Sequence, residues 1–128
     1  MSGQVTVALQ STWRAEEYRA AGRLVEELGF DGLSIYADLG FQPPIPALLE
    51  VARVTSRIRL GPACLNPYLL HPVEIAGQIA SLDEASGGRA YLGLARGSWL
   101  DRVGVAQERP LAHLRDTIAI VARLLAGD

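Results

Sequence analysis

The chain has 128 residues, of which 49% are hydrophobic and 20% charged, and its formal net charge is −2. One domain of this length can bury a core, and this composition is not that of a disordered chain. Without a basic run, nucleic acid is a poor candidate for a partner. No disulfide can form within a chain that has one cysteine, and no apolar run approaches the ~20 residues of a membrane span. We therefore expect a cytoplasmic protein without a signal peptide.

Short strand-like segments, the first of them β-branched, alternate with amphipathic segments along the chain. Strands are predicted at residues 5–9, 32–36, 57–61 and 90–94. Helices are predicted at residues 14–28, at about 47–55, after Pro72 and after Pro110. The last helix is predicted to carry apolar side chains on one face, Leu111, Leu114, Ile118, Val121 and Leu125. The order β-α-β-α-β-α-β-α predicts parallel strands, either in part of a (β/α)8 barrel or in an open doubly wound sheet.

The unusual residues lie in the connections that lead from a strand to the next helix. These connections contain QST, YADLGFQPP, PACLNPYLLH and ARGSW, whereas the turns from helix to strand are short. In both architectures ligands bind at the carboxyl ends of the strands. The sequence therefore predicts that this side of the sheet is the functional one.

Four motifs within residues 55–99 occur together and in order. They are T-x-R-I-x-L-G, N-P followed by H-P, L-D-x-x-S-G-G-R and L-G-L-x-x-G. In this combination the chain resembles the luciferase-like flavin-dependent oxidoreductases, which include bacterial luciferase and the reductases that use the deazaflavin coenzyme F420. The resemblance extends over nearly the whole chain, and NPYLLHP most resembles the methylenetetrahydromethanopterin reductase-like branch.

The resemblance implies an α/β fold. Members of the family are (β/α)8 TIM barrels, so residues 1–128 would form a single parallel (βα)4 domain that corresponds to the N-terminal half of such a barrel. A half-barrel leaves two strand edges unpaired and one flank of its core uncovered. We therefore expect a homo-oligomer, a pair with a complementary half-barrel chain, or a fragment of a longer protein.

The resemblance also implies a function. It is hydride transfer between F420 or FMN and a small organic substrate, with little or no turnover by the isolated chain and with no metal site. Two alternatives stay open, an FMN-dependent monooxygenase and a non-catalytic half-barrel that acts through its interface. The sequence does not distinguish F420 from FMN, and it does not identify the substrate.

Two cofactor contacts are implied at the connection after the third strand. The family has a non-proline cis peptide there, which presses the backbone against the flavin ring, and ungapped matching places this bond between Ala63 and Cys64. The amide of Asn66 is expected either to meet the edge of the ring or to form an Asx turn.

Three further cofactor contacts are expected at the end of the fourth strand and just after it. Gly93 and Gly97 allow close approach of the backbone, and Arg96 offers a guanidinium fork for the cofactor phosphate. The alternative for Arg96 is a surface salt bridge.

Asp38 is the candidate catalytic residue. Many members of the family have a histidine at this position, so a mechanism that depends on histidine cannot be transferred to this chain. A carboxylate could exchange a proton if burial raised its pKa. The alternative is a solvated acid in a loop.

The remaining polar residues are expected to be structural. A Cys64 nucleophile activated by His71 is disfavoured against a small apolar cysteine and a helix-capping histidine. Arg89 is expected to stabilise the fold, His113 to be exposed to solvent, and Gln10 with its neighbour Ser11 to lead into the first helix.

Overall fold

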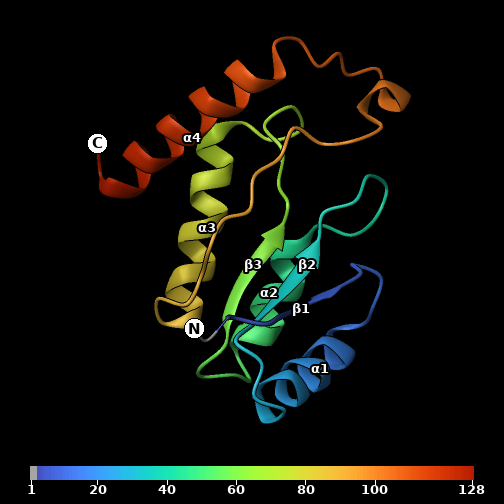
Figure 1. Ribbon diagram of the computed structural model, residues 1–128, viewed down its shortest axis with the longest axis vertical. Coiled ribbons are helices and arrows are strands. Elements are labelled where there is room, and N and C mark those ends of the chain that lie inside the picture. The colour runs from blue at the N-terminus through green and yellow to red at the C-terminus, as the bar shows by residue number, and fades with distance from the viewer. Residues whose placement is uncertain (1–2) are drawn as a thin grey trace.

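The structure is a computed structural model and describes residues 3–128 (Figure 1). In chain order its elements are β1 (Thr6–Leu9), α1 (Ala15–Glu27), β2 (Gly32–Tyr36), α2 (Pro44–Ala52), β3 (Arg59–Ala63), α3 (Pro72–Ser86), the 3-10 helix η1 (Leu100–Val103) and α4 (Pro110–Ala126). The predicted α/β fold with alternating strands and helices is confirmed.

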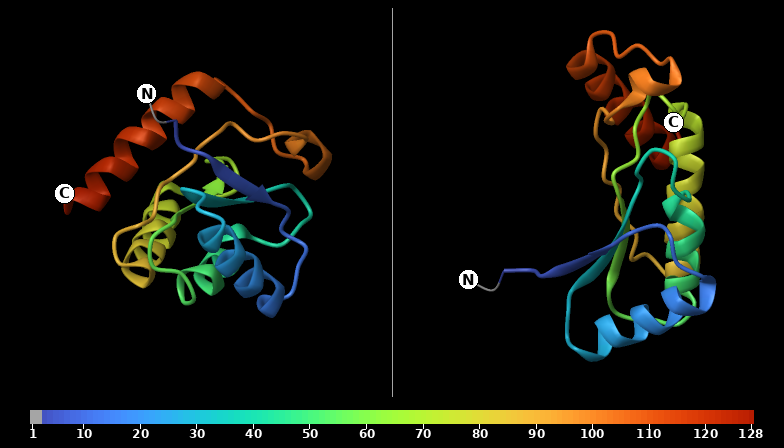
Figure 2. Two further views of the ribbon diagram at one scale, coloured as in Figure 1. Left: turned by 60° about the horizontal axis from the view of Figure 1, so that its bottom comes forward. Right: turned by 90° about the vertical axis from the view of Figure 1, so that its right-hand side faces the viewer.

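The three strands form one parallel sheet in the order β1-β2-β3. Figure 2 shows that helices cover one face of this sheet and leave the other face without a helix. On the covered face Leu33, Ile35 and Leu60 are fully buried against Leu48 and Val51 of α2. A sheet covered on one side, with right-handed βα units, has the form of a segment of barrel wall.

The predicted fourth strand is only partly formed. Residues 90–94 run beside β3 but make two isolated parallel bridges instead of a regular ladder, Leu60 with Ala90 and Leu65 with Leu94. Pro62 lies between these bridges and has no N–H to donate, which interrupts the ladder. The prediction of a regular strand at residues 90–94 was therefore wrong, although the chain follows the path of such a strand.

The third strand is shifted by two residues from its predicted range of 57–61. The N–H groups of Arg57 and Ile58 both donate to the carboxylate of Glu26, at 2.7 and 3.0 Å, so they are not free to begin the ladder. Helix α2 begins earlier than predicted, at Pro44, because proline is well suited to the first turn of a helix.

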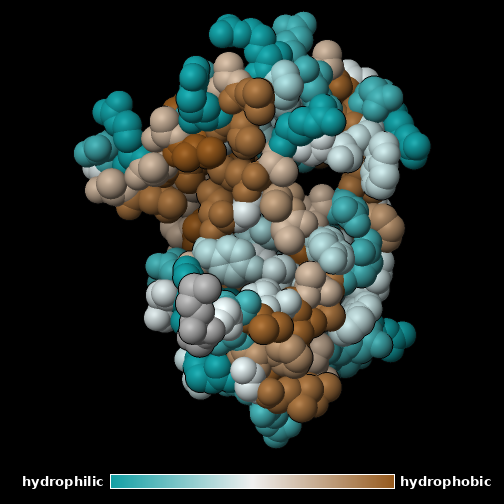
Figure 3. All heavy atoms as spheres, viewed as in Figure 1, coloured by the Kyte–Doolittle hydropathy of each residue, from teal (hydrophilic) through white to brown (hydrophobic). Residues whose placement is uncertain are grey.

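The apolar face predicted for the last helix, α4, is mostly exposed. Helix α4 packs mainly on α3, with Val121 buried there, but Leu111 is 83% exposed and Ile118 is 51% exposed. Only the side of α4 that faces α3 is covered, so Leu111, Ile118 and Leu125 of this apolar face are left exposed. Figure 3 shows apolar surface over this part of the molecule. Neither α4 nor any other helix in residues 3–128 is long and apolar enough to cross a membrane.

Candidate functional site

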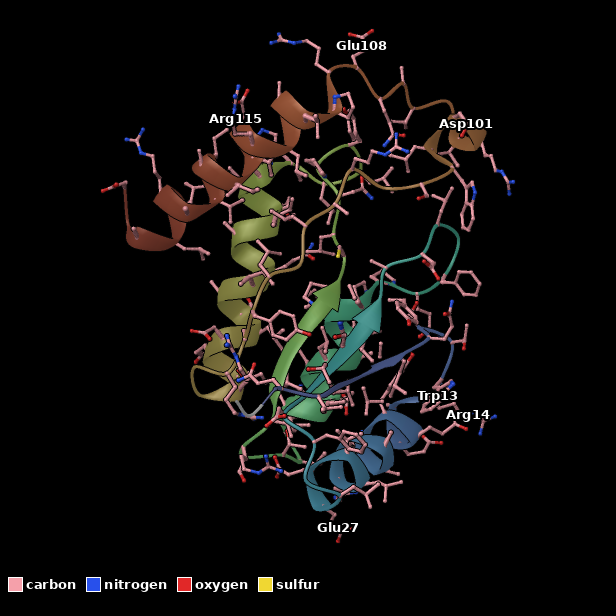
Figure 4. The ribbon with its side chains drawn as sticks, viewed as in Figure 1. Trp13, Arg14, Glu27, Asp101, Glu108 and Arg115 are labelled. Atoms are coloured by element: carbon pink, nitrogen blue, oxygen red, sulfur yellow. The ribbon has the colours of Figure 1, made fainter. Side chains whose placement is uncertain are left out.

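A cavity of about 620 Å³ opens at the carboxyl end of the sheet. Its walls come from three connections, residues 37–44 after β2, residues 63–70 after β3, and residues 95–100 leading into η1. Figure 3 shows a hollow at this edge, and Figure 4 shows η1, marked by Asp101, on the far side of it from the loop after β2. The volume lies in the usual range of small-molecule sites, roughly 300–1,000 Å³.

Most of the candidate site residues line this cavity. They are Asp38, Ala63, Cys64, Asn66, Arg96 and Gly97. These residues lie far apart in sequence and meet here because the carboxyl ends of parallel strands share one edge of the sheet. The remaining candidate, Gly93, lies beneath the cavity and does not line it.

The floor of the cavity is the backbone at the end of β3. The peptide bond between Ala63 and Cys64 is cis, as the family resemblance implied. Burial raises the pKa of the Cys64 thiol, which favours the neutral thiol over the nucleophilic thiolate. The ring of His71 accepts a hydrogen bond from the N–H of Val73 at 3.2 Å, so His71 caps α3 and is not paired with Cys64.

Asn66 holds the turn after the floor. Its side-chain Oδ1 accepts hydrogen bonds from the N–H groups of Tyr68 and Leu69, at 3.2 and 3.0 Å, which is the Asx turn that was one of the two alternatives. Gly97 has a φ of +82°, and a Cβ at this position would lie 3.1 Å from Nδ2 of Asn66. Glycine at 97 therefore allows the wall at residues 95–100 to pack closely against the wall that contains Asn66.

Gly93 packs directly against β3. A Cβ at Gly93 would meet the carbonyl oxygen of Pro62 and would lie 3.1 Å from Sγ of Cys64. Gly93 was expected to let the backbone approach the cofactor closely. The close approach that it makes is instead to β3, below the floor of the cavity.

Asp38 lies at the open rim. Its side chain is exposed, so the burial on which its proposed proton transfer depended is not found. Nε2 of Gln10 donates to Oδ2 of Asp38 at 3.1 Å. Gln10, expected only to lead into α1, thus orients the carboxylate.

The loop that carries Arg96 is held by a residue that the sequence analysis missed. Nε2 of Gln107 donates to the carbonyl oxygens of Arg96 and Gly97, at 2.5 and 3.1 Å. No motif marks Gln107, which follows Arg96 by eleven residues. The guanidinium of Arg96 is exposed and forms no ion pair within residues 3–128, so the alternative of a surface salt bridge is not found.

Aromatic side chains stand at the mouth of the cavity. Phe41 and Trp99 line it and are about half exposed. Arg102 lies over the ring of Trp99, 5.5 Å from its centroid. The side chains of the floor residues Ala63 and Cys64 are small, and Arg96 and Asp38 are the charged residues that line the cavity. This arrangement suits a flat, largely apolar ligand with an anionic group.

Two residues outside the cavity have structural roles. Arg89 donates to the carbonyl oxygens of Ile58 and Thr55, at 2.8 and 2.9 Å, which confirms its stabilising role. The expectation that His113 is exposed was wrong, because its ring is half-buried and stacks on that of Tyr68 with 4.6 Å between centroids.

The motifs, the half-barrel sheet and the cavity at its carboxyl edge together define one class of protein. The family model described as "Luciferase-like monooxygenase" matches residues 2–128, and the chain belongs to this family. The 5,10-methylenetetrahydromethanopterin reductase of Archaeoglobus fulgidus is 35% identical over 107 residues, which cover 82% of this chain and 32% of that protein. The oxygenase component of the flavin-dependent trigonelline monooxygenase of Acinetobacter baylyi is 30% identical over 90 residues, covering 66% of this chain and 25% of that protein.

The fold agrees with solved structures of the same family. The coenzyme F420-dependent tetrahydromethanopterin reductase of Methanopyrus kandleri superposes with a TM-score of 0.76 and 30% identity, over 84% of this chain and 31% of that one. The structural neighbours are TIM-barrel enzymes, and this chain matches a part of the barrel. It spans about a third of the length of the curated relatives it matches.

Proposed function

We propose that this chain supplies the cofactor-binding wall of a luciferase-like oxidoreductase, which transfers a hydride between F420 or FMN and a small organic substrate. Completion by a second half-barrel is part of the proposal, because the uncovered sheet face and the exposed side of α4 leave the site open. The isolated chain is then expected to turn over slowly or not at all.

The observation that carries the proposal is the meeting of Asp38, Ala63 and Arg96 in one cavity. These residues come from three separate βα connections, which is the arrangement of active sites in TIM barrels. Similarity to reductases that use F420 supports the choice of reaction. Family membership supports a flavin-type cofactor.

The residues present fit a flat ring with a phosphate-bearing tail. Small side chains at Ala37, Ala63 and Ala95 leave room for a ring on the floor, and a side chain at Gly97 would fill the gap beside Asn66. When bound, the cofactor would accept or deliver the hydride. Arg96 would bind the phosphate. Asp38, held by Gln10, would hold or accept a proton at the rim once a second half-barrel covers its carboxylate, which is exposed in this chain alone.

An FMN-dependent monooxygenase is the second candidate within the family. It is supported by the similarity to the trigonelline monooxygenase component and by the description of the family. Oxygen uptake in the presence of reduced FMN would favour this candidate, and anaerobic reduction of F420 would favour the first.

A non-catalytic half-barrel is the candidate from another class. The exposed apolar side chains of α4 support it, because such a surface is typical of a protein interface. In that case the cavity would bind neither cofactor, and association would be the main property of the chain.

Titration with F420 and with FMN separately tests the proposal. Cofactor fluorescence reports binding, and sedimentation in the same samples reports the size of the assembly. We expect saturable binding of one cofactor with one site per chain. If neither cofactor binds to the isolated chain or to its assemblies, the proposal is wrong and the non-catalytic candidate is favoured.

A further inference from the structure

The face of the sheet without helices is polar and contains no acid. Leu33, Ile35 and Leu60 point into the covered core, so the alternating residues point to the open face. These include Thr6, Ala8, Ser34, Tyr36, Arg59 and Tyr91. No aspartate or glutamate occurs in β1, β2, β3 or residues 90–94. In a completed barrel this face becomes part of the interior.

Arg59 is the only charged residue in these four segments. Its guanidinium lies 5.7 Å from the centroid of the Tyr91 ring, and it forms no ion pair within residues 3–128. Asp31 precedes β2, and its carboxylate accepts a hydrogen bond from the N–H of Val5 at 2.7 Å. Asp38 follows β2 at the opposite, carboxyl end of the strands. Among the described residues, Arg59 therefore has a cation–π neighbour and no counter-ion.

A second copy of this chain would not supply a counter-ion. If two copies closed a barrel about a two-fold axis, β3 of each would stand opposite β3 of the other. The two Arg59 side chains would then lie at the same height, in an interior that is just wide enough for side chains to fill. Two like charges in one layer without an acid oppose association.

We infer that Arg59 determines which polypeptide completes the barrel. It favours a non-identical half-barrel polypeptide with a carboxylate at the same level of the barrel interior as Arg59, in preference to a second copy of the chain. The inference rests on the completion of the barrel in the proposed function and does not depend on which cofactor binds. Charge complementarity carries it, because the open face offers one cation and no acid.

The chain itself can serve as the acid-bearing probe. The variant Arg59→Glu places a carboxylate where the complementary half would need one. Sedimentation velocity and equilibrium are run on the wild type, on R59E, and on an equimolar mixture of the two. The matched control is R23E, which changes the net charge equally on the exposed surface of α1. Circular dichroism verifies folding, which R59E should retain because the Arg59 side chain is exposed and makes no hydrogen bond within residues 3–128.

We expect the mixture of wild type and R59E to form a one-to-one complex, with a dissociation constant roughly tenfold or more below that of either protein alone. Hydrogen exchange should slow at the amides of β1 in the mixture only. The mixture of wild type and R23E should associate no more than the wild type does. The neutral variant R59Q, alone, should associate more strongly than the wild type, which gives a second test if R59E does not fold.

Two results would overturn the inference. One is self-association of the wild type as tight as that of the mixture, which would show that a second copy is accepted. The other is no gain in association for the mixture or for R59Q. Arg59 does not line the cavity, so neither result bears on cofactor binding. Conversely, failure of the cofactor titration would leave the sedimentation result unchanged.

Discussion

The hydroxyl of Tyr91 lies 2.5 Å from the hydroxyl of Ser34, although β3 separates the two residues in the sheet. The Tyr91 ring crosses over Gly61, where a Cβ would lie 2.5 and 2.6 Å from two ring carbons. Through this contact the irregular segment at residues 90–94 is fixed to β2 as well as to β3. Glycine at 61 is therefore required for the position of the fourth segment.

The substitution Gly61→Ala should destabilise the protein by about 1–3 kcal/mol, the usual cost of overpacking a filled site. The methyl carbon of the alanine would also lie only 2.6 Å from the carbonyl oxygen of Tyr91, and backbone cannot move aside as a side chain can. The measurement is the free energy of unfolding in urea. The control is Gly77→Ala in α3, where a Cβ would meet no atom of residues 3–128 within 4 Å beyond the adjoining helix backbone, and alanine should stabilise the helix slightly. Equal stability of G61A and wild type would contradict the prediction.

The substitution Glu26→Gln should destabilise the protein by about 1 kcal/mol at neutral pH, and less in acid. Burial acts to raise the pKa of Glu26, but the N–H groups of Arg57, Ile58 and Ser56 donate to the carboxylate and lower its pKa below the ordinary 4.5. A lowered pKa in the folded state means that the charged form stabilises the fold above pH 4.5. This contribution is lost as the pH falls through the folded-state pKa.

Urea unfolding of the wild type and E26Q at several pH values checks this. The difference between the two proteins should be constant from pH 7 to about 5 and should shrink below pH 4.5. Glu27→Gln is the control, because Glu27 is exposed and makes no side-chain hydrogen bond or ion pair within residues 3–128. A difference that persists unchanged at pH 3 would rule out the carboxylate charge as its cause.

The sequence predicted the parts of the fold that depend on local pattern. The short apolar segment at residues 32–36 and the proline starts of α3 and α4 correspond directly to the observed elements. The errors arise where a distant group decides the outcome. The N–H groups of Arg57 and Ile58 bind Glu26, some 30 residues away, and so delay β3. The exposure of α4 depends on which neighbour covers it, and helical periodicity does not encode that.

The candidate site shows the same division. The family resemblance identified Asp38, Ala63 and Arg96, and parallel topology explains why they meet. The supporting residues could not be found in this way. Gln10 acts through one side-chain hydrogen bond and Gln107 through two, and only the folded loops bring these partners together. Glutamine in a loop is unremarkable in a sequence.

The substitution Arg96→Gln should weaken binding of the preferred cofactor about tenfold or more, because a charge-assisted hydrogen bond to phosphate is lost. Arg96→Lys should restore part of the affinity, since it keeps the charge but not the planar fork. The measurement is the fluorescence titration. Arg102→Gln is the matched control, because Arg102 is nearby and exposed but does not line the cavity. Equal losses for R96Q and R102Q would indicate a general effect of charge and not a phosphate contact.

The substitution Asp38→Asn should reduce turnover of the active assembly about tenfold or more while leaving cofactor affinity within about twofold. Asparagine keeps the shape of the side chain and its acceptor for Gln10, but it cannot take up a proton at the rim. Steady-state kinetics and the cofactor titration separate the two effects. Asp101→Asn on η1 serves as the control for loss of a surface charge. Full activity of D38N would remove Asp38 from the mechanism.

Cys64 should react slowly with iodoacetamide, and a bound cofactor should slow the reaction further. Burial raises the pKa of the thiol, so at pH 8 the reactive thiolate is a smaller fraction than in an exposed cysteine. Cys64 is the only cysteine, so alkylation measured by mass spectrometry reports this site alone. N-acetylcysteine is the reference thiol, and the rate should rise with pH at a higher midpoint than for the reference. Alkylation as fast as that of N-acetylcysteine would contradict the burial of the thiol. A rate unchanged by saturating cofactor would contradict the placement of the cofactor on the cavity floor, because Sγ of Cys64 would then remain as accessible as before.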